Sequence, residues 1–305
     1  MSAPLSSYFN RLLCFFLALS PLFLNLACEN KKASKPETSF ITVTDDLGRQ
    51  IRVPRNPQRL MALAPSATEM LYAVADEETI VGRTQNCDFP VRVKDKPVVN
   101  NYPMDYEKLV LLKPDLVFTV AGITSAEVAA KLQDLNITVY YQDFQQVTDI
   151  FRGLQDMGRL LHREKAAQRV IDSLQQQLAQ LKVNNNGPKL RVLAITWHDP
   201  IYVYGQNTLF SDKLRYLGAE NAVKEVFAQP YPALTREYIL KLNPDVLIGG
   251  TPAEMEETFF KLYPELKKIN AYQHKRIFRA TDNLMSRPGP RVVESIRELK
   301  SFLVP

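Results

Sequence analysis

The sequence is short of the residues that catalytic and metal sites need. Its three histidines, His162, His198 and His274, stand far apart and do not form a metal-ligand spacing. None of them lies beside a candidate nucleophile, and the motifs GxGxxG, GxSxG and the P-loop are absent. We therefore expect a protein that is not an enzyme and has no metal site or resident cofactor. The alternative from another functional class is a metal-dependent enzyme with its site between two lobes.

Cysteine is equally scarce. The three cysteines are Cys14, Cys28 and Cys87, and the first lies inside an apolar run. That run, Leu12 to Ala27, is short and interrupted by Ser20, Pro21 and Asn25, which is typical of a signal-peptide core rather than of a membrane span. Cys87 then has no partner, so the sequence predicts no disulfide framework.

The junction after this run resembles the cleavage site of bacterial lipoproteins, because Cys28 follows Leu26-Ala27. We predict a signal peptide over residues 1–27, a lipidated Cys28 and a flexible tether over residues 28–39. The protein would then be anchored to a membrane, in the periplasm or at the cell surface. Plain secretion with a free or trimmed Cys28 is the alternative.

The formal charge of +5 is spread along the chain, apart from three lysines between residues 31 and 35. Such dispersion does not form a nucleic-acid footprint. With 305 residues, 46% of them hydrophobic, the chain can build two cores of ordinary domain size.

The organising stretch is an amphipathic pattern from about Thr148 to Lys182, with a break expected near His162. On either side, short β-branched runs alternate with helical patterns, which predicts parallel sheets of the Rossmann type. We predict an α/β fold with a lobe over residues 40–160, one long linking helix over 161–187 and a second lobe over 188–305. The expected strands are 40–44, 50–53, 59–63, 79–81, 97–99, 116–120, 137–141, 190–196, 245–249 and 276–279.

Ser66 and Glu69 have the spacing of a capping box at the start of a helix. That local role is sufficient to explain Glu69, and we assign it no function.

An internal match relates the two predicted lobes. Residues 105–117 align without gaps on residues 235–247, so that Glu107 corresponds to Glu237 at a constant offset. Each copy predicts an N-cap residue, an apolar helix, a Pro-Asp turn and a buried strand. The two carboxylates either complement the helix dipoles or serve a shared function.

Ligands of open α/β sheets bind at the carboxyl ends of the strands, and the loops expected there mix aromatic and amide side chains. Turn composition alone explains Asp88, but it explains Trp197 and Tyr231 poorly. The predicted ligand-binding residues are Asn86, Asp88, Asn101, Tyr102, Trp197, Tyr231, Asp282, Asn283, Met285 and Arg287.

As an ordered set, several segments resemble the periplasmic solute-binding proteins of the cobalamin and iron-siderophore ABC uptake family. The matching segments are 43–49, 59–69, 112–117, the 148–182 stretch and 287–291. The resemblance implies two α/β lobes joined by one long helix, with the ligand bound between them. It also implies that Glu107 and Glu237 dock on arginines of a two-fold-symmetric permease. We further expect a monomer.

The ligand implied by the resemblance is a corrinoid such as cobalamin. Cys87-Asp88-Phe89-Pro90 resembles the Cys-Asp-Tyr-Pro loop of cobalamin-type members, and residues 197–200 and 287–291 agree with it. In a known cobalamin binder, an aromatic residue falls where this chain has Asn101, and a tryptophan falls where it has Tyr231. A ferric siderophore or haem is the alternative ligand.

Overall fold

A computed structural model describes residues 39–183 and 187–303. The predicted signal peptide, Cys28 and the tether as far as Thr38 lie outside these residues. Within the described ranges, no helix combines the length and the apolar character that crossing a membrane requires. The fold described below belongs to the unit that starts at Ser39.

The first lobe begins with an antiparallel hairpin and continues with parallel strands. In the larger sheet β6 lies between β3 and β7, and Leu60, Leu116 and Thr138 are in register. Its strands are β1 (Phe40–Thr44), β2 (Gln50–Pro54), β3 (Leu60–Ala62), β4 (Arg83–Thr84), β5 (Val98–Val99), β6 (Leu116–Val120) and β7 (Thr138–Gln142). Its helices are α2 (Pro65–Val74), α3 (Tyr106–Leu112) and α4 (Ala126–Asp134), with short 3-10 turns at Glu77–Thr79 and Val91–Asp95.

The second lobe has a mixed sheet in the order β11-β9-β8-β12-β13, with β10 pairing β8. Strand β8 turns back into β9 within three residues, a connection too short for a parallel crossover, so β9 is antiparallel. The strands are β8 (Arg191–Trp197), β9 (Ile201–Val203), β10 (Glu220–Asn221), β11 (Ala233–Leu234), β12 (Val246–Ile248) and β13 (Ile277–Phe278). The helices are α7 (Leu209–Tyr216), α8 (Arg236–Leu242), α9 (Pro252–Glu257), α10 (Phe259–Leu262), α11 (Asn270–Gln273), α12 (Asp282–Ser286) and α13 (Val292–Leu303), with a 3-10 turn at Pro264–Lys268.

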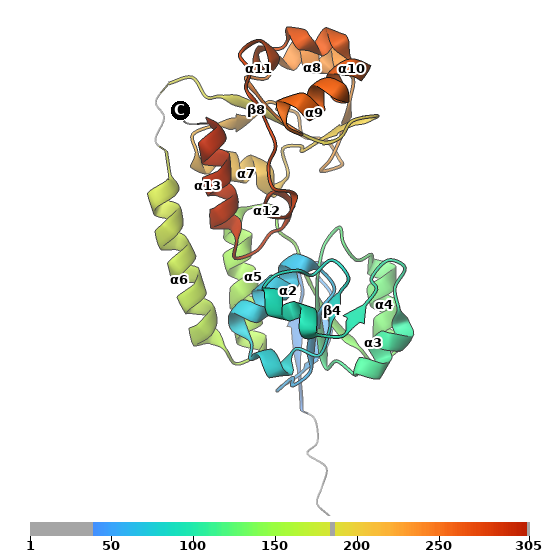
Figure 1. The fold of residues 1–305 in the computed structure, drawn as a ribbon. Helices are drawn as coiled ribbons and strands as arrows, with labels where there is room; N and C mark the ends of the chain where they lie inside the picture. The colour runs from blue at the N-terminus through green and yellow to red at the C-terminus, as the bar shows by residue number, and fades with distance from the viewer. Residues whose placement is uncertain (1–38, 184–186, 304–305) are drawn as a thin grey trace, which may run out of the picture. The chain divides into compact units, whose positions relative to one another are not determined.

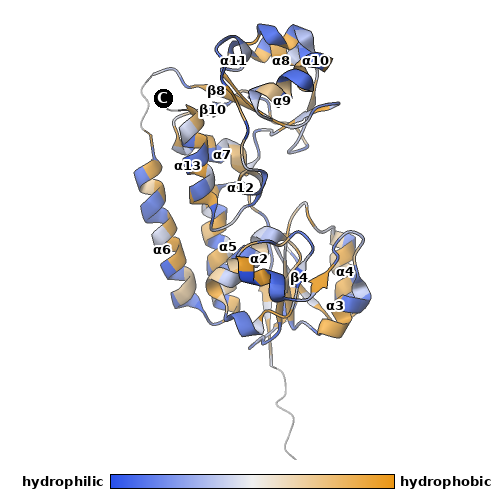
Figure 2. Ribbon diagram, in the orientation of Figure 1, coloured by the Kyte–Doolittle hydropathy of each residue, from blue (hydrophilic) through white to orange (hydrophobic). Residues whose placement is uncertain are grey.

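Two helices, α5 (Val147–Leu160) and α6 (Glu164–Leu181), join the lobes. The break falls where the sequence predicts it, at His162, whose φ of 55° ends the helical path. Helix α6 packs against α5, against α2 of the first lobe and against α13 of the second (Figure 1). Its buried residues recur every three or four positions with polar residues between them, as an amphipathic helix requires (Figure 2): Ala167, Ile171, Leu174 and Leu178.

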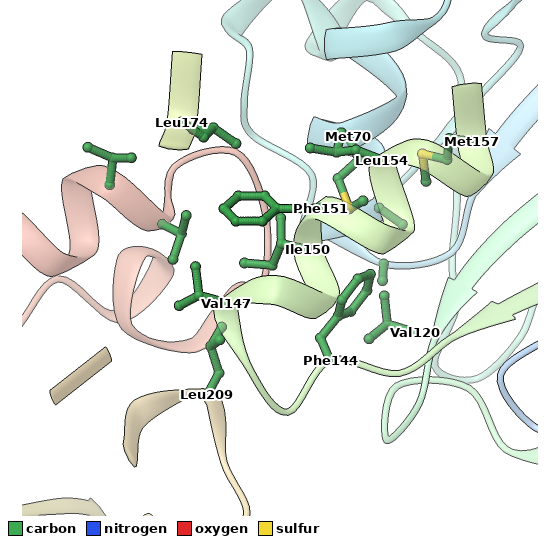
Figure 3. Packing of buried hydrophobic residues seen from close by; sticks show 14 of the residues in the cluster. Met70, Val120, Phe144, Val147, Ile150, Phe151, Leu154, Met157, Leu174 and Leu209 are labelled. Atoms are coloured by element: carbon green, nitrogen blue, oxygen red, sulfur yellow. The ribbon is translucent and has the colours of Figure 1, made fainter. Parts of the chain in front are cut away.

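The largest hydrophobic core runs through both lobes along these helices. Figure 3 shows Ile150, Phe151 and Leu154 of α5 amid Leu174 of α6 and Leu209 of α7. The same cluster includes residues of α2 and α13, so the interface between the lobes is itself part of the core. Smaller clusters cover the opposite face of each sheet.

Two local predictions are wrong. Helix α2 starts at Pro65 after the N-cap residue Ala64, and no side chain caps it, so Ser66 and Glu69 form no capping box. Proline suits the first helical position, because its missing N–H would have no partner there and its φ is already helical, and the helix therefore starts two residues earlier than predicted. The expected strand at 79–81 is instead the end of a 3-10 turn and one bridge between Ile80 and Leu60.

The internal match is confirmed in detail. The side chains of Asp105 and Thr235 cap α3 and α8, and both helices end at a left-handed residue, Lys113 or Asn243. The turns that follow are held in the same way. Asp115 accepts hydrogen bonds from the backbone N–H of Gln58 and Arg59 at 2.8 and 2.9 Å, and Asp245 accepts one from the N–H of Arg191 at 3.0 Å.

Candidate functional site

A cavity of about 940 Å³ opens between the lobes. Loops at the carboxyl ends of β3, β4 and β6 line it from the first lobe, and residues after β9 and around α12 line it from the second. This is the edge at which open α/β sheets bind ligands. The volume lies near the upper end of the usual range of small-molecule sites, which is roughly 300–1,000 Å³.

The lining is rich in carboxamides. Six amide side chains face the cavity, and they come from both lobes: Gln85, Asn86, Asn101, Gln145, Asn207 and Asn283. Asn101 is fixed by its own bonds, because its Nδ2 donates to the carbonyl of Leu63 at 3.0 Å and its N–H donates to Gln85 Oε1 at 3.1 Å. Such groups both donate and accept, so they suit a ligand that is edged with similar groups.

Aromatic rings form a second part of the wall. Tyr204 packs edge-on against Tyr231 at 5.3 Å between ring centroids and in a tilted arrangement against Phe210 at 5.2 Å, and all three residues line the cavity. Burial raises the pKa of Tyr204 and of Tyr231, so both phenols are neutral at physiological pH. Phe144 and Phe227 add further apolar surface.

An ion cluster joins the lobes at one side of the cavity. Glu69 of α2 accepts hydrogen bonds from Arg291 at 2.9 and 2.6 Å and from Arg287 Nη1 at 3.0 Å. The Glu69 side chain is only 1% exposed, so it needs these cations as partners. We refer to Glu69, Asp88, Arg287 and Arg291 as the inter-lobe ion cluster.

Asp88 completes this cluster from the loop after β4. Its Oδ1 accepts from Arg287 Nη1 at 2.5 Å, and its Oδ2 accepts from Asn283 Nδ2 at 2.8 Å. Partial burial raises the pKa of Asp88, but the hydrogen bond and charge of Arg287 outweigh it and hold that pKa below its ordinary value. Asp88 is therefore ionised at neutral pH.

The structure brings most of the predicted site residues together. The predicted residues that line the cavity are Asn86, Asp88, Asn101, Tyr231, Asn283, Met285 and Arg287. Asp282 lines a smaller cavity of about 370 Å³, which shares Tyr204 and Met285 with the first.

Two predicted residues do not line either of these cavities within the described part of the chain. Tyr102 is 90% exposed, and Trp197 is 63% exposed with its Nε1 donating to the carbonyl of Asp199 at 2.9 Å. A contact of either residue with ligand stays a prediction.

Sequence reasoning missed the cavity wall that follows β9, including Tyr204 and Phe210. The available signal is weak: Ile201 and Val203 are buried on either side of the exposed Tyr202, an alternation only three residues long. It also missed Glu69, since a plausible local role hid a partner that lies 222 residues further along the chain.

The paired carboxylates Glu107 and Glu237 are both exposed in the first turn of equivalent helices. Glu237 forms an ion pair with Arg236 at 3.1 Å. A backbone hydrogen bond at its own position and this arginine lower its pKa, so it carries a negative charge.

Metal-ligating side chains do not gather in the described ranges, where no group of three or more His, Cys, Asp or Glu residues is placed to hold an ion. His198 packs against Phe259, and burial lowers its pKa. Cys87 is buried and accepts or donates weak hydrogen bonds with Thr68 and Thr84 at 3.2 and 3.1 Å.

With this geometry established, comparison with known proteins identifies the family. The family described as "Periplasmic binding protein" matches residues 60–284, and the chain belongs to this family. An uncharacterized ABC transporter substrate-binding lipoprotein of Bacillus subtilis, YvrC, is 28% identical over 287 residues, which cover 91% of this chain and 90% of that protein. The vitamin B12-binding protein of Pectobacterium carotovorum is 27% identical over 254 residues, covering 81% and 88%.

A solved structure agrees with this assignment. The crystal structure of a possible iron-binding, periplasmic solute-binding protein from Staphylococcus epidermidis superposes with a TM-score of 0.74 and 29% identity, over 82% of this chain and all of that one. The class predicted from the sequence and its α/β fold are confirmed. The chain is thus a substrate-binding protein of an ABC transporter, a class with a small-molecule ligand and a permease partner.

Proposed function

We propose that this protein captures a corrinoid, with cobalamin as the leading candidate, in the cavity between its lobes and delivers it to an ABC importer. The observation that carries the proposal is the lining: six carboxamides surround a cavity of about 940 Å³ that also has aromatic walls. A corrinoid is a broad macrocycle whose rim carries carboxamide groups, and these can exchange hydrogen bonds with amide groups of the lining.

The aromatic residues support the same ligand. The rings of Tyr204, Tyr231 and Phe210 offer apolar surface for the faces of a large ring system, and the two neutral hydroxyls can donate to its rim. The relative of Pectobacterium named as a vitamin B12-binding protein agrees with the proposal.

An iron chelate or haem is the second candidate, favoured by the phenols of Tyr204 and Tyr231 in the cavity and by the similarity to the possible iron-binding protein of Staphylococcus epidermidis. An iron-ligating phenol must lose its proton, and burial raises the pKa of both tyrosines. This opposes ligation, and we rank the corrinoid first.

We further propose that Glu107 and Glu237 dock on matching arginines of a two-fold-symmetric permease, and that a lipidated Cys28 anchors the protein to a membrane. The equivalent positions of the two exposed carboxylates in matched helices support the docking. Each exposed ion pair contributes only about 0.2–1 kcal/mol, which favours a complex that releases easily.

Binding of cyanocobalamin, haemin and a ferric tricatecholate to the purified protein tests the proposal. We expect saturable binding of cyanocobalamin, measured by calorimetry and by the absorption spectrum of the complex. Asn207→Ala and Asn283→Ala should weaken it, while Asn56→Ala, which replaces an exposed amide outside the cavity, should not. Binding of haemin or the tricatecholate in place of cyanocobalamin would select the second candidate.

A further inference from the structure

Arg287 is the sole lysine, arginine or histidine in the cavity lining formed by the described residues. An anionic ligand entering this cavity would therefore have one cation to meet. Whether that cation is available depends on its partners in the inter-lobe ion cluster.

The pairing within the cluster is unequal. Arg291 binds Glu69 through two atoms, with Nε at 2.9 Å from Oε2 and Nη2 at 2.6 Å from Oε1. This two-point contact satisfies the charge of Glu69 with one guanidinium. Arg287 Nη1 also donates to Glu69 Oε1, at 3.0 Å, so this oxygen accepts hydrogen bonds from both arginines.

Asp88 is then the carboxylate that balances Arg287. The same Nη1 lies 2.5 Å from Asp88 Oδ1, and Nη2 donates to the carbonyl of Asn86 at 3.1 Å. The Asp88 side chain is 45% exposed, whereas that of Arg287 is 11% exposed. A ligand in the cavity therefore meets the Asp88 carboxylate more readily than the Arg287 guanidinium.

A second lining carboxylate, Asp143, forms no ion pair within the described residues: it accepts a hydrogen bond from Gln145 at 3.2 Å, and Arg152 donates to its backbone carbonyl at 2.7 Å. With Arg287 and Asp88 cancelling each other, the lining carries a net negative charge from Asp143. Bringing a polyanion into such a partly enclosed site costs electrostatic energy that no free cation offsets.

We infer that Asp88 is a specificity-determining residue: by neutralising Arg287 it makes the cavity reject polyanionic ligands, such as ferric tricatecholates, and admit ligands without net negative charge. The inference deepens the proposed function and rests on this cavity being the ligand site. On this inference, Asp88 determines whether the cavity binds ligands without net negative charge, such as a corrinoid, or polyanionic iron chelates.

The test compares wild type, Asp88→Asn and Asp143→Asn with two probes, cyanocobalamin and a ferric tricatecholate. Both substitutions remove one negative charge from the lining, but only Asp88→Asn uncovers Arg287. We expect Asp88→Asn to raise affinity for the tricatecholate by about tenfold or more, and to do so less strongly at high salt, because exposed charges are screened. Asp143→Asn should raise that affinity by clearly less than Asp88→Asn does, because it removes a negative charge but frees no cation.

Cyanocobalamin serves as the neutral probe, and Asp88→Asn should not raise its affinity, because a ligand without net charge gains no ion pair from the uncovered Arg287. Thermal melting confirms that each variant is folded, and Asp88→Ser replaces Asp88→Asn if the latter is not. An equal gain in both variants would show that only the net charge matters, and no gain in Asp88→Asn would overturn the inference outright. Wild type that fails to bind cyanocobalamin, with the tricatecholate gain intact, would refute the proposed ligand and leave the role of Asp88 standing.

Discussion

Glu69 and Arg291 form a two-point ion pair between the first helix of one lobe and the start of the last helix of the other. The Glu69 side chain is almost fully buried, so its charge depends on this pair and on Arg287. The contact fixes the position of the 287–291 segment beside the cavity.

Replacing Glu69 by Gln should therefore destabilise the protein strongly. Arg291 would lose its carboxylate and Arg287 one of its two, and breaking a largely buried ion pair in this way typically costs about 3–5 kcal/mol. The free energy of unfolding in urea measures this loss. The same substitution at the exposed Glu78 should change it by less than about 0.5 kcal/mol, and an equally mild effect at Glu69 would show that the cluster does not hold the lobes together.

Gly153 of α5 packs against Phe144, a residue of the cavity lining, so a substitution at Gly153 can alter the cavity without replacing a lining residue. A Cβ at this position would lie 2.7 Å from the ring of Phe144, which lines the cavity. We expect Gly153→Ala to push that ring toward the ligand and to weaken ligand binding, while better helix propensity, roughly 1 kcal/mol, offsets part of the strain.

The matched control is Gly158→Ala in the same helix. There the added Cβ would meet the Cβ of Ala167 in α6 at 2.7 Å, an atom that no side-chain rotation can move. This variant should lose about 1–3 kcal/mol of stability and keep its ligand affinity. Calorimetric titration and thermal melting compare the two, and a larger affinity loss in Gly158→Ala would contradict the assignment.

Lys213 of α7 should give the protein an unusual response to alkaline pH. Its Nζ is buried and donates to the carbonyls of Leu284 and Met285 at 3.0 Å each and to Ser295 at 2.8 Å, and burial lowers its pKa to about 7. In the unfolded chain the pKa is about 10.4, so above pH 7 the unfolded state binds more protons than the folded state. Stability should then rise between pH 7 and 9, by at most about 1.4 kcal/mol per pH unit from this group.

Urea unfolding at several pH values checks the expectation, with Lys213→Met as the comparison. The variant lacks the titrating amine, so its stability should rise less across the same interval. Parallel curves for the two proteins would mean that Lys213 keeps its proton, held by its three acceptors.

Charge reversal tests the docking proposal. Glu107→Lys combined with Glu237→Lys should stop uptake in cells, because arginines that attract two carboxylates would repel two lysines, while ligand binding by the isolated protein stays unchanged. Reversing the exposed Glu78 and Glu257 in the same way controls for net charge. Uptake that survives the first reversal would leave Glu107 and Glu237 as helix-dipole partners only.

Anchoring is tested at Cys28. Cys28→Ser should move the protein from the membrane fraction to the soluble fraction, because a single serine offers no site for the acyl chains that hold a lipoprotein. Fractionation followed by immunoblotting measures the shift. Retention of the whole variant population on membranes would exclude lipidation as the anchor.

The sequence was informative where the pattern is local and repeated. Matched residues at 105–117 and 235–247 predict both N-caps and both buried strands, because capping and burial are set by near neighbours. The cavity was predicted in part, since loops after parallel strands meet at one edge.

Long-range contacts were beyond reach for a physical reason. The partner of Asp88 lies 199 residues away, and nothing near either residue marks the pairing. At Glu69 the capping box was a sufficient local explanation, but it was wrong. The helix starts at Pro65, and the Glu69 carboxylate pairs with Arg287 and Arg291, which lie far along the chain. Tertiary contacts decide such positions.

The distance along the chain between Glu69 and its two arginines also sets an order of events. The partners follow it by 218 and 222 positions, and helix α13, which covers α6, comes after both. A chain that emerges from its amino end, from a ribosome or through a membrane pore, exposes Glu69 and the face of α6 that α13 covers long before Arg287, Arg291 and α13 follow. Glu69 must stay hydrated during that interval, and the core through both lobes closes when the last helix arrives. The interface between the lobes is therefore the last part of this core to form as the chain emerges.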